Sequence, residues 1–315
     1  MFDEKIYLTG YTVDATRNIT LTAAGSSQVA SGSSQRHTGI EGTGAIIRPN
    51  SSSTDSILVV ELDYTTIEWL EVSGVLAIGS GVSGISVSTS AGDYSIVRNN
   101  IVHDTRYDNI FIGSPGCRVY NNISYNALQA CIHVRLGNNS EIYNNSAYSG
   151  SNGGIKVNNA TGITVRNNIS MASYDLWVIN GGSITASSNN LSSDDTADDF
   201  GGTGNLINKT ASNQFVSLSG TIDLHLKSGS DAIGAGGDLS AAFANDIDGK
   251  IRTTVWDIGA DEITDPLIYY SVGADTSALY SGNASASSGM LTLATSAVDR
   301  RSEEHTSELQ SRQSI

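Results

Sequence analysis

The chain has 315 residues, of which 33 are Gly and only 3 are Pro, and 16% are charged. Its formal net charge of −15 argues against nucleic acid and anionic membranes as partners. No apolar run approaches the ~18 residues that span a bilayer, and the acidic opening MFDEKIYLTG lacks the apolar core of a signal peptide. Low charge with many Ser, Thr and Asn residues is typical of β-rich extracellular proteins. We therefore expect an all-β fold located outside the cell or on its surface.

Strand-like segments begin within a few residues of Met1, in KIYLTGYTV and NITLTA. A solenoid needs a cap over its first coil, and these strands leave no room for one. We therefore interpret residues 1–54 as entry strands whose cap and signal peptide are missing from this sequence. The segments SILVVEL and TTIEWLEVSG follow as early coils of the main domain, residues 55–263.

Pairs of adjacent asparagines recur between apolar flanks. They occupy positions 99–100, 121–122, 144–145, 167–168 and 189–190. The steps of 22 or 23 residues indicate a solenoid, and alternating apolar residues such as Ile155 and Val157 indicate strands. Leucine-rich repeats are excluded because these units contain almost no Leu. Since equivalent positions stack ~4.8 Å apart, each amide can donate to one neighbour and accept from the next, so the pairs are predicted to form a structural ladder.

One outward-facing column is predicted on a strand that precedes each Asn pair by about a dozen residues. Apolar residues align on both sides of the column in successive units, and the residue between them points outward. The column contains Ser86, Phe111, His133, Lys156 and Trp177. Aromatic faces stack on sugar rings and cations pair with uronate carboxylates. We therefore assign Phe111 and Trp177, together with Arg135, to the binding of an acidic polysaccharide. A solenoid wall with mixed side chains is the open alternative.

A second outward-facing column lies just before the Asn pairs. It contains Arg98, Tyr120, Tyr143 and Arg166. These residues are also assigned to polysaccharide binding, but cation–π stacking between Arg and Tyr explains the same column as a structural feature. Both interpretations remain open from the sequence.

The turn HDTRYDN is the most charged turn of the repeats and leads into the first column. Together the turn and the column supply the candidate catalytic residues Asp104, Arg106, Asp108, His133 and Lys156. A uronic-acid lyase needs a neutralised substrate carboxylate and a base for the C5 proton. Asp104 and Asp108 are candidate Ca²⁺ ligands, Arg106 is a candidate neutralising cation, and His133 or Lys156 is the candidate base. In a hydrolase, the two aspartates would instead be the carboxylate pair; a solvated polar loop is the structural alternative.

The two cysteines, Cys117 and Cys131, lie at different phases of the repeat. Stacking of the coils does not bring them together, so we predict buried thiols rather than a disulfide.

The chain leaves the ladder through the acidic loop at residues 194–204 and then contains LKSGSDAIGAG, DIDGKIR and DIGADE. DIDGK lacks the later ligands of a calcium loop, so we predict an Asp-Gly turn in which Arg252 pairs with a carboxylate. The Asn-Asn repeats and this closing text resemble the right-handed parallel β-helix proteins of the pectate-lyase-like superfamily, of the secreted bacterial type. The resemblance covers residues 11–263 and implies a right-handed parallel β-helix with about 22–23 residues per coil.

The C-terminal part of the chain differs from the repeats. Residues 264–300 resemble the truncated start of a further β module. Residues 301–315 contain RSEEHTSELQS, which resembles an in-frame translation of a common sequencing adapter, and we interpret this segment as non-native.

The resemblance implies an extracellular carbohydrate-interacting protein, either a lyase or a hydrolase of acidic polysaccharide. No catalytic signature of the family can be transferred residue by residue. A non-catalytic surface adhesin or a phage tail-spike-like binding protein is the alternative from another class. Convergence of the charged turn with His133 or Lys156 in one cleft would favour the enzyme, and a flat wall would favour the adhesin. Ca²⁺ is the only candidate cofactor, and the substrate and oligomeric state stay open.

Overall fold

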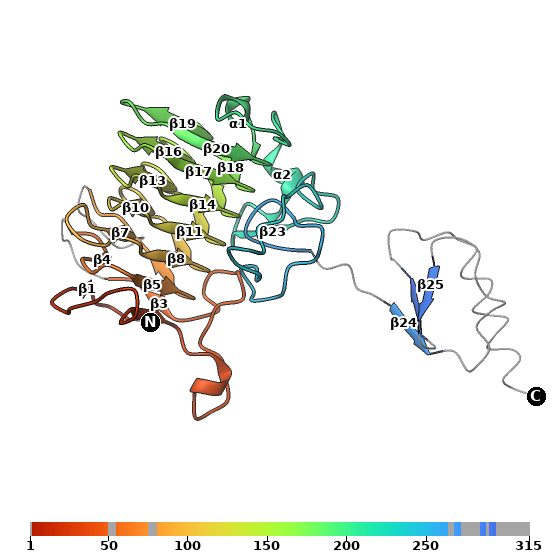
Figure 1. Cartoon of the computed structure of the whole chain (residues 1–315). Helices are drawn as coiled ribbons and strands as arrows, with labels where there is room; N and C mark the ends of the chain where they lie inside the picture. The colour runs from red at the N-terminus through yellow and green to blue at the C-terminus, as the bar shows by residue number, and fades with distance from the viewer. Residues whose placement is uncertain are drawn as a thin grey trace, which may run out of the picture. The chain divides into compact units, whose positions relative to one another are not determined.

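The computed structural model describes residues 2–49, 55–74 and 81–263, together with the strands at 268–271, 284–287 and 290–293. The chain divides into two units, Met1–Ile263 and Thr264–Ile315. In the first unit, short strands stack one above another into a column of coils, from β1 near the N-terminus to β19 (Figure 1). Parallel pairing between successive coils confirms the predicted β-solenoid.

Three parallel sheets form the walls of the column. Sheet 1 contains β1 (Ile6–Leu8), β4 (Leu58–Val60), β7 (Ile85–Val87), β10 (Ile110–Ile112), β13 (Ile132–Arg135), β16 (Ile155–Asn158) and β19 (Leu176–Ile179). Sheet 2 contains β2 (Ile19–Thr22), β5 (Thr65–Glu68), β8 (Ile96–Arg98), β11 (Arg118–Tyr120), β14 (Glu141–Tyr143), β17 (Ile163–Arg166) and β20 (Ile184–Ser188). Sheet 3 contains β3 (Ile46–Ile47), β6 (Glu71–Ser73), β9 (Ile101–His103), β12 (Ile123–Tyr125), β15 (Ser146–Tyr148), β18 (Ile169–Met171) and β21 (Leu191–Ser192). Each regular coil contributes one strand to each sheet.

The core is a narrow column of aliphatic side chains between the sheets. In sheets 1 and 2, alternation along each strand points the apolar residues inward, so Ile110, Ile112 and Val119 are fully buried. The thiols of Cys117 and Cys131 are free and buried, as predicted. At one end of the column, Ala197 and Phe200 from the short helix α1 (Thr196–Asp199) and its C-cap join the same core.

The second asparagine of each pair forms the predicted ladder. The side-chain amides of Asn100, Asn122, Asn145 and Asn168 each donate to the amide oxygen one coil further on, at 3.0–3.1 Å. The acceptor of the last bond is Asn190. All five side chains are fully buried, and their oxygens also accept from backbone N–H groups of the preceding coil. The ladder therefore satisfies the polar groups at the corner between sheets 2 and 3.

The first asparagine of each pair has a different role. These residues adopt left-handed backbone conformations with φ between 44° and 56°, which Asn tolerates better than most residues. Their side-chain amides donate to backbone carbonyls of residues 215–263, which we call the closing segment. Asn99 donates to Asp246, Asn121 to Asn245, and Asn144 to both Asp257 and Gly259. Asn167 donates to Gly237, and Asn189 donates to Ala235. One residue type thus turns each coil and docks a distant part of the chain.

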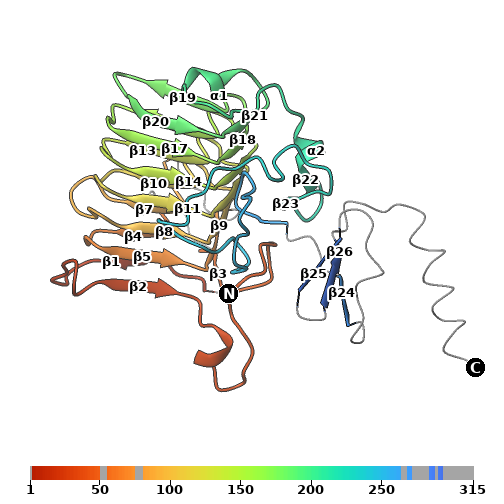
Figure 2. The same ribbon diagram turned by 45° about the vertical axis from the view of Figure 1, so that its right-hand side comes forward.

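The closing segment covers the outer face of sheet 3. It follows the helix α2 (Ala211–Gln214) and contains the antiparallel hairpin of β22 (Phe215–Ser217) and β23 (Asp223–Leu226). Phe215 and Leu224 belong to the same buried cluster as Ile123 and Ile169 of sheet 3. Figure 2 shows this segment, in cyan to blue, beside the stacked coils. Its buried Arg252 pairs with Glu262 at 3.0 Å, which confirms the predicted ion pair.

The second unit contains three described strands, β24 (Ile268–Ser271), β25 (Ala284–Ser287) and β26 (Met290–Leu293), in an antiparallel sheet with β26 in the middle. The interpretation of residues 301–315 as non-native falls outside the described residues. None of the described helices is long and apolar enough to cross a membrane.

Candidate functional site

The predicted column on sheet 1 forms as expected. Strand register places Ser86, Phe111, His133, Lys156 and Trp177 side by side on successive strands. The ring edge of His133 contacts Phe111, with centroids 5.6 Å apart. Tyr174, in the turn before β19, stacks on Trp177 at 4.9 Å and is 50% exposed. Tyr174 was not predicted from the sequence, although it stands only three residues before Trp177.

Lys156 is the central charged residue of this column. Its ammonium lies 4.6 Å from the centre of the Trp177 ring, in a cation–π contact, and only 8% of the residue is exposed. Burial lowers the pKa of Lys156, and the nearby carboxylate of Asp108 acts in the opposite direction. A lysine with a lowered pKa supplies more of the neutral amine near neutral pH, as a general base requires.

His133 is held by the carboxylate of Asp108. Its Nδ1 lies 2.8 Å from Asp108 Oδ2, and both residues are almost fully buried. The other oxygen of Asp108 accepts from the backbone N–H of Ala130. Nδ1–H donation to Asp108 fixes the orientation of the ring, and Nε2 has no hydrogen-bond partner among the described residues. Asp108 is therefore a positioning residue for His133.

Asp104 and Arg106 lie in a different environment from Asp108. They line an open pocket of about 460 Å³ with Asn126, Leu128 and other residues of the turns that follow sheet 3. Asp104 bonds His103 of β9 in sheet 3, whereas Asp108 bonds His133 in sheet 1. The two carboxylates take hydrogen-bond partners on different sheets, and the assignment of Asp104 and Asp108 as a Ca²⁺ pair or a hydrolase pair stays a prediction. The five candidate catalytic residues thus fall into two groups.

A second pocket, of about 360 Å³, adjoins the first through Asp104 and contains charged residues that the sequence analysis did not assign. Its lining includes Glu41, Arg48, Glu71 and His103. His103 lies between Glu71 Oε1, at 3.2 Å, and Asp104 Oδ2, at 2.6 Å. Burial opposes protonation of His103, but these hydrogen bonds outweigh it and raise the pKa of the imidazole.

Two carboxylates of the second pocket, those of Glu71 and Asp104, have lowered pKa values. Burial would raise the pKa values of Glu71 and Asp104, but hydrogen bonds from His103 outweigh burial and lower both. The general acid of a glycoside hydrolase needs a raised pKa. Neither carboxylate meets that requirement, so this pocket does not favour the hydrolase hypothesis.

The column on sheet 2 also forms, but its aromatic rings are covered. Register aligns Arg98, Tyr120, Tyr143 and Arg166. Tyr120 stacks on Phe243 of the closing segment at 4.5 Å, and Tyr120 and Tyr143 are 4% and 6% exposed. Their predicted role in polysaccharide binding is wrong, because the closing segment occupies the surface that a sugar would need. Arg98 pairs with Glu68 and lies over Tyr120, which agrees with the structural alternative.

Arg135 provides an exposed cation on the face of sheet 1. It lies at the end of β13, two residues beyond His133, so both side chains project from the same side of the strand. Its neighbour on β16 is Asn158, whose side chain accepts from Asn180 on the next coil at 2.9 Å. The face of sheet 1 thus combines cations, amides and aromatic rings, and its chemistry suits an anionic sugar polymer.

The comparison with known families agrees with the architecture. Residues 37–218 match the family model described as the right handed beta helix region. Among solved structures, the crystal structure of pectate lyase Pel9A is similar at 15% identity and a TM-score of 0.36, over 83% of this chain and 87% of that one. No curated protein matches the sequence.

Proposed function

This chain belongs to the right-handed beta helix family, and from the face of its sheet 1 we propose that it binds an acidic polysaccharide outside the cell and cleaves it by β-elimination. The observation that carries the proposal is Lys156, a lysine whose pKa is lowered by burial and whose ammonium lies against Trp177 on the outer face of the sheet. His133, oriented by Asp108, is its neighbour on the adjacent strand.

Sugar rings would bind along the strands' stacking direction. Phe111 and Trp177 are three strands apart in register, which corresponds to roughly 14 Å and gives room for more than one sugar unit. The partly exposed rings of Trp177 and Tyr174 provide apolar surface for sugar stacking. Arg135 pairs with the substrate carboxylate, because its planar guanidinium matches a carboxylate in two parallel hydrogen bonds.

In the chemical step, the neutral amine of Lys156 removes the proton from C5 of a uronate residue. The electron pair from that C–H bond forms the C4–C5 double bond, and the bond from C4 to the glycosidic oxygen breaks. A proton from water completes the leaving sugar as a new reducing end, and the lysine proton returns to solvent. Arg135 stabilises the negative charge that develops on the carboxylate during proton removal.

A non-catalytic binding protein is the second candidate function, and one observation favours it. Asp104 and Arg106 line a pocket whose lining does not include His133 or Lys156, and Asp104 bonds His103 and Asn126. A rigid surface that only binds sugar does not need these charged residues to lie together in one cleft. This candidate keeps the polysaccharide and the extracellular location but omits the lysine's chemistry.

The deciding experiment incubates the full chain with pectins, alginates and glycosaminoglycans, with and without Ca²⁺. Unsaturated-uronate absorbance and new reducing ends are followed together, and binding is measured separately by affinity electrophoresis. The variants are Lys156→Met, which keeps the apolar stem, and Lys209→Met as a matched control. Lys209 forms an ion pair with Asp231 in another part of the first unit.

We expect unsaturated product from the wild type and from Lys209→Met, and at least a 100-fold loss in Lys156→Met, the lower end of what a general base contributes. Reducing ends without unsaturation would replace the lyase by a hydrolase. Binding without either product would leave the non-catalytic candidate. A folded protein that binds none of the polymers would overturn both.

A further inference from the structure

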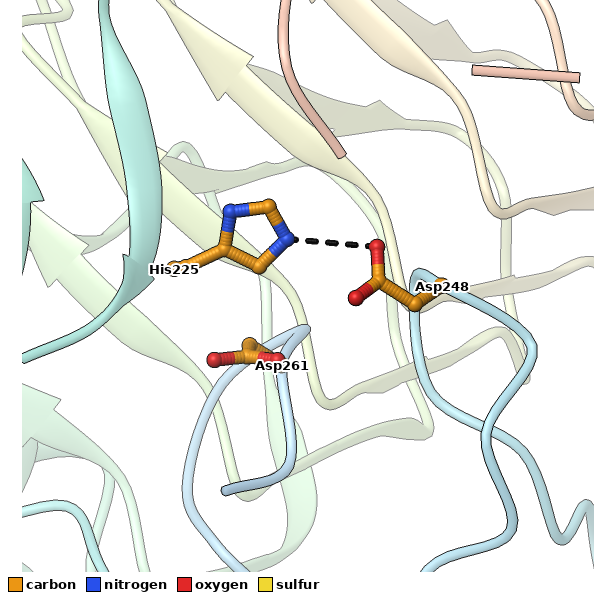
Figure 3. A group of neighbouring side chains, drawn as sticks. All are labelled: His225, Asp248 and Asp261. Carbon is orange, nitrogen blue, oxygen red and sulfur yellow. Dashed lines mark hydrogen bonds and ion pairs between the residues drawn. The ribbon is translucent and has the colours of Figure 1, made fainter. Parts of the chain in front are cut away.

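Three side chains from separate parts of the closing segment meet beside Gly39, which lies in a loop of the N-terminal region. His225 lies on β23, Asp248 lies in the DIDGK turn, and Asp261 lies near the segment's end (Figure 3). One ligand atom from each residue lies within 4.8 Å of the other two. We propose that His225, Asp248 and Asp261 bind a divalent transition-metal ion of the Zn²⁺ class, and that this ion fastens the closing segment. The site is independent of the polysaccharide face.

The imidazole of His225 is oriented as a metal ligand. Its Nδ1 lies 2.6 Å from Asp223 Oδ1, so a neutral ring that donates there directs the lone pair of Nε2 away from Asp223. Nε2 lies 3.2 Å from Asp248 Oδ1, and Figure 3 shows it directed at that oxygen. A carboxylate behind the histidine is the usual second partner of a metal-binding imidazole. A bare lone pair facing a carboxylate oxygen is repulsive unless a cation or a proton lies between them.

Asp261 adds a second, buried carboxylate to the proposed site. The residue is 4% exposed, and the hydrogen bond described for its carboxylate comes from the backbone N–H of Leu226, at 2.9 Å. Burying an ionised carboxylate is costly without a cation close to it. A bound divalent ion meets this need.

Asp248 divides its two oxygens between separate partners. Its Oδ2 pairs with the half-exposed Lys250 at 2.7 Å, and its Oδ1 faces His225. Oδ1 is therefore the metal-ligand atom. One imidazole and two carboxylates form a mixed nitrogen and oxygen donor set, which suits Zn²⁺ and its first-row neighbours, whereas Ca²⁺ takes oxygen donors throughout.

Gly39 leaves space directly over the ligands. Its φ is +72°, and a Cβ built on it would lie 2.3 Å from His225 Nε2 and 3.1 Å from Asp248 Oδ1. Any side chain at this position would fill the space in front of the proposed ligand atoms. The loop that contains Gly39 can therefore approach the site closely because glycine has no side chain to fill this space.

The test uses the full chain, purified with an affinity tag that contains no histidine and stripped with EDTA. Binding of Co²⁺ is followed by its visible absorption, and binding of Zn²⁺ by calorimetry. The ligand variants are His225→Gln and Asp261→Asn. His103→Gln is a matched control, because His103 also lies between two carboxylates, those of Glu71 and Asp104.

We expect one tightly bound Co²⁺ or Zn²⁺ per wild-type chain, retained in His103→Gln and lost in both ligand variants. Absence of binding to the wild type, or unchanged binding to His225→Gln and Asp261→Asn, would overturn the proposal. If a ligand variant fails to fold, the stripped wild type still decides the matter. Its unfolding temperature must rise with Zn²⁺ and not with an equal concentration of Ca²⁺. An unfolding temperature that does not respond to Zn²⁺ would mean that a protonated His225 bridges Asp223 and Asp248 without metal.

Discussion

The two adjacent asparagines of each coil have different structural roles, and the difference arises from the φ angle of the first one. The first residue of the pair is left-handed, so its side chain leaves the column and reaches the closing segment, as Asn144 does. The second residue, such as Asn145, points inward and stacks. The sequence period was sufficient to predict the ladder. The docking role was not predictable, because its acceptor carbonyls lie more than a hundred residues away for Asn144 and are backbone atoms that leave no mark in the sequence.

Substitutions at one such pair separate the two roles. Asn145→Ala leaves the amide of Asn122 and the carbonyl of Val119 buried without these partners. We expect a loss of about 3–5 kcal/mol in the free energy of unfolding, since each buried unsatisfied group costs about 1–3 kcal/mol. Asn144→Gly keeps the left-handed turn but removes two bonds to the closing segment and one bond from Asn167, for a loss of about 1–3 kcal/mol. Urea denaturation measures both, and equal losses would contradict the division of roles.

The pH dependence of cleavage follows from Lys156. A general base works as the neutral amine, so kcat/KM should rise about tenfold per pH unit until the pH reaches the pKa of Lys156. Burial places that pKa below the usual 10.5. Because the charge of Asp108 raises this pKa, Asp108→Asn should move the rising limb to lower pH, even where reorientation of His133 lowers the maximal rate. A limb that stays in place, or moves upward, would rule out Lys156 as the base.

At the level of elements, sheet 3 differs from the other two sheets in the side that carries its apolar residues. Small residues such as Ser124 and Ala147 point into the column, while Ile123 and Ile169 point outward under the closing segment. Alternation in the sequence predicts that two faces exist, but it does not say which face meets the main core. The closing segment could be recognised in the sequence, but its position could not. It packs over sheet 3 and over Tyr120, and this packing explains why apolar side chains point outward there.

Arg252 joins two parts of the closing segment and also contacts the coils through Asn121. It is buried, pairs with Glu262, and also donates to Asn121 and to the carbonyls of Gly259 and Ala260. Arg252→Met leaves the Glu262 carboxylate without its cation, so we expect a loss of about 3–5 kcal/mol.

A double variant at Arg252 and Glu262 tests whether the loss of stability comes from the unpaired carboxylate of Glu262. Combining Arg252→Met with Glu262→Gln removes both charges, and its loss of stability should be smaller than the sum of the two single losses by about 1–3 kcal/mol. Denaturant unfolding of all four proteins gives this coupling directly. Additive losses would mean that the ion pair contributes nothing beyond the packing of each side chain.

At the level of the whole chain, the regular and irregular parts differed in how far they could be predicted. The coils repeat, so strand positions, register and the outward column of Lys156 followed from local spacing. The grouping of candidate catalytic residues did not. Turn 104–109 has no counterpart of similar charge in the other regular repeats, and its two aspartates bond histidines on different sheets. The pocket around Glu71 and His103 also draws Glu41 and Arg48 from the N-terminal region, and no period relates those residues to the repeat.

A column of coils should lose order from an uncovered end rather than all at once, because each coil contacts only its neighbours. Phe200 covers one end, and it is 8% exposed in the core cluster that includes Leu176 of β19. Phe200→Ala removes that cover, so native-state hydrogen exchange should quicken in β19 and β20 while β10 and β13 remain protected. A chain ending at Ile263 is the control, since the boundary between the two units falls there, and its exchange pattern should match that of the full chain. Equal loss of protection in β10 and β19 would instead mean that the three sheets, the Asn ladder and the closing segment unfold as one cooperative unit, and that the long-range bonds of the closing segment outweigh the nearest-neighbour contacts of the coils.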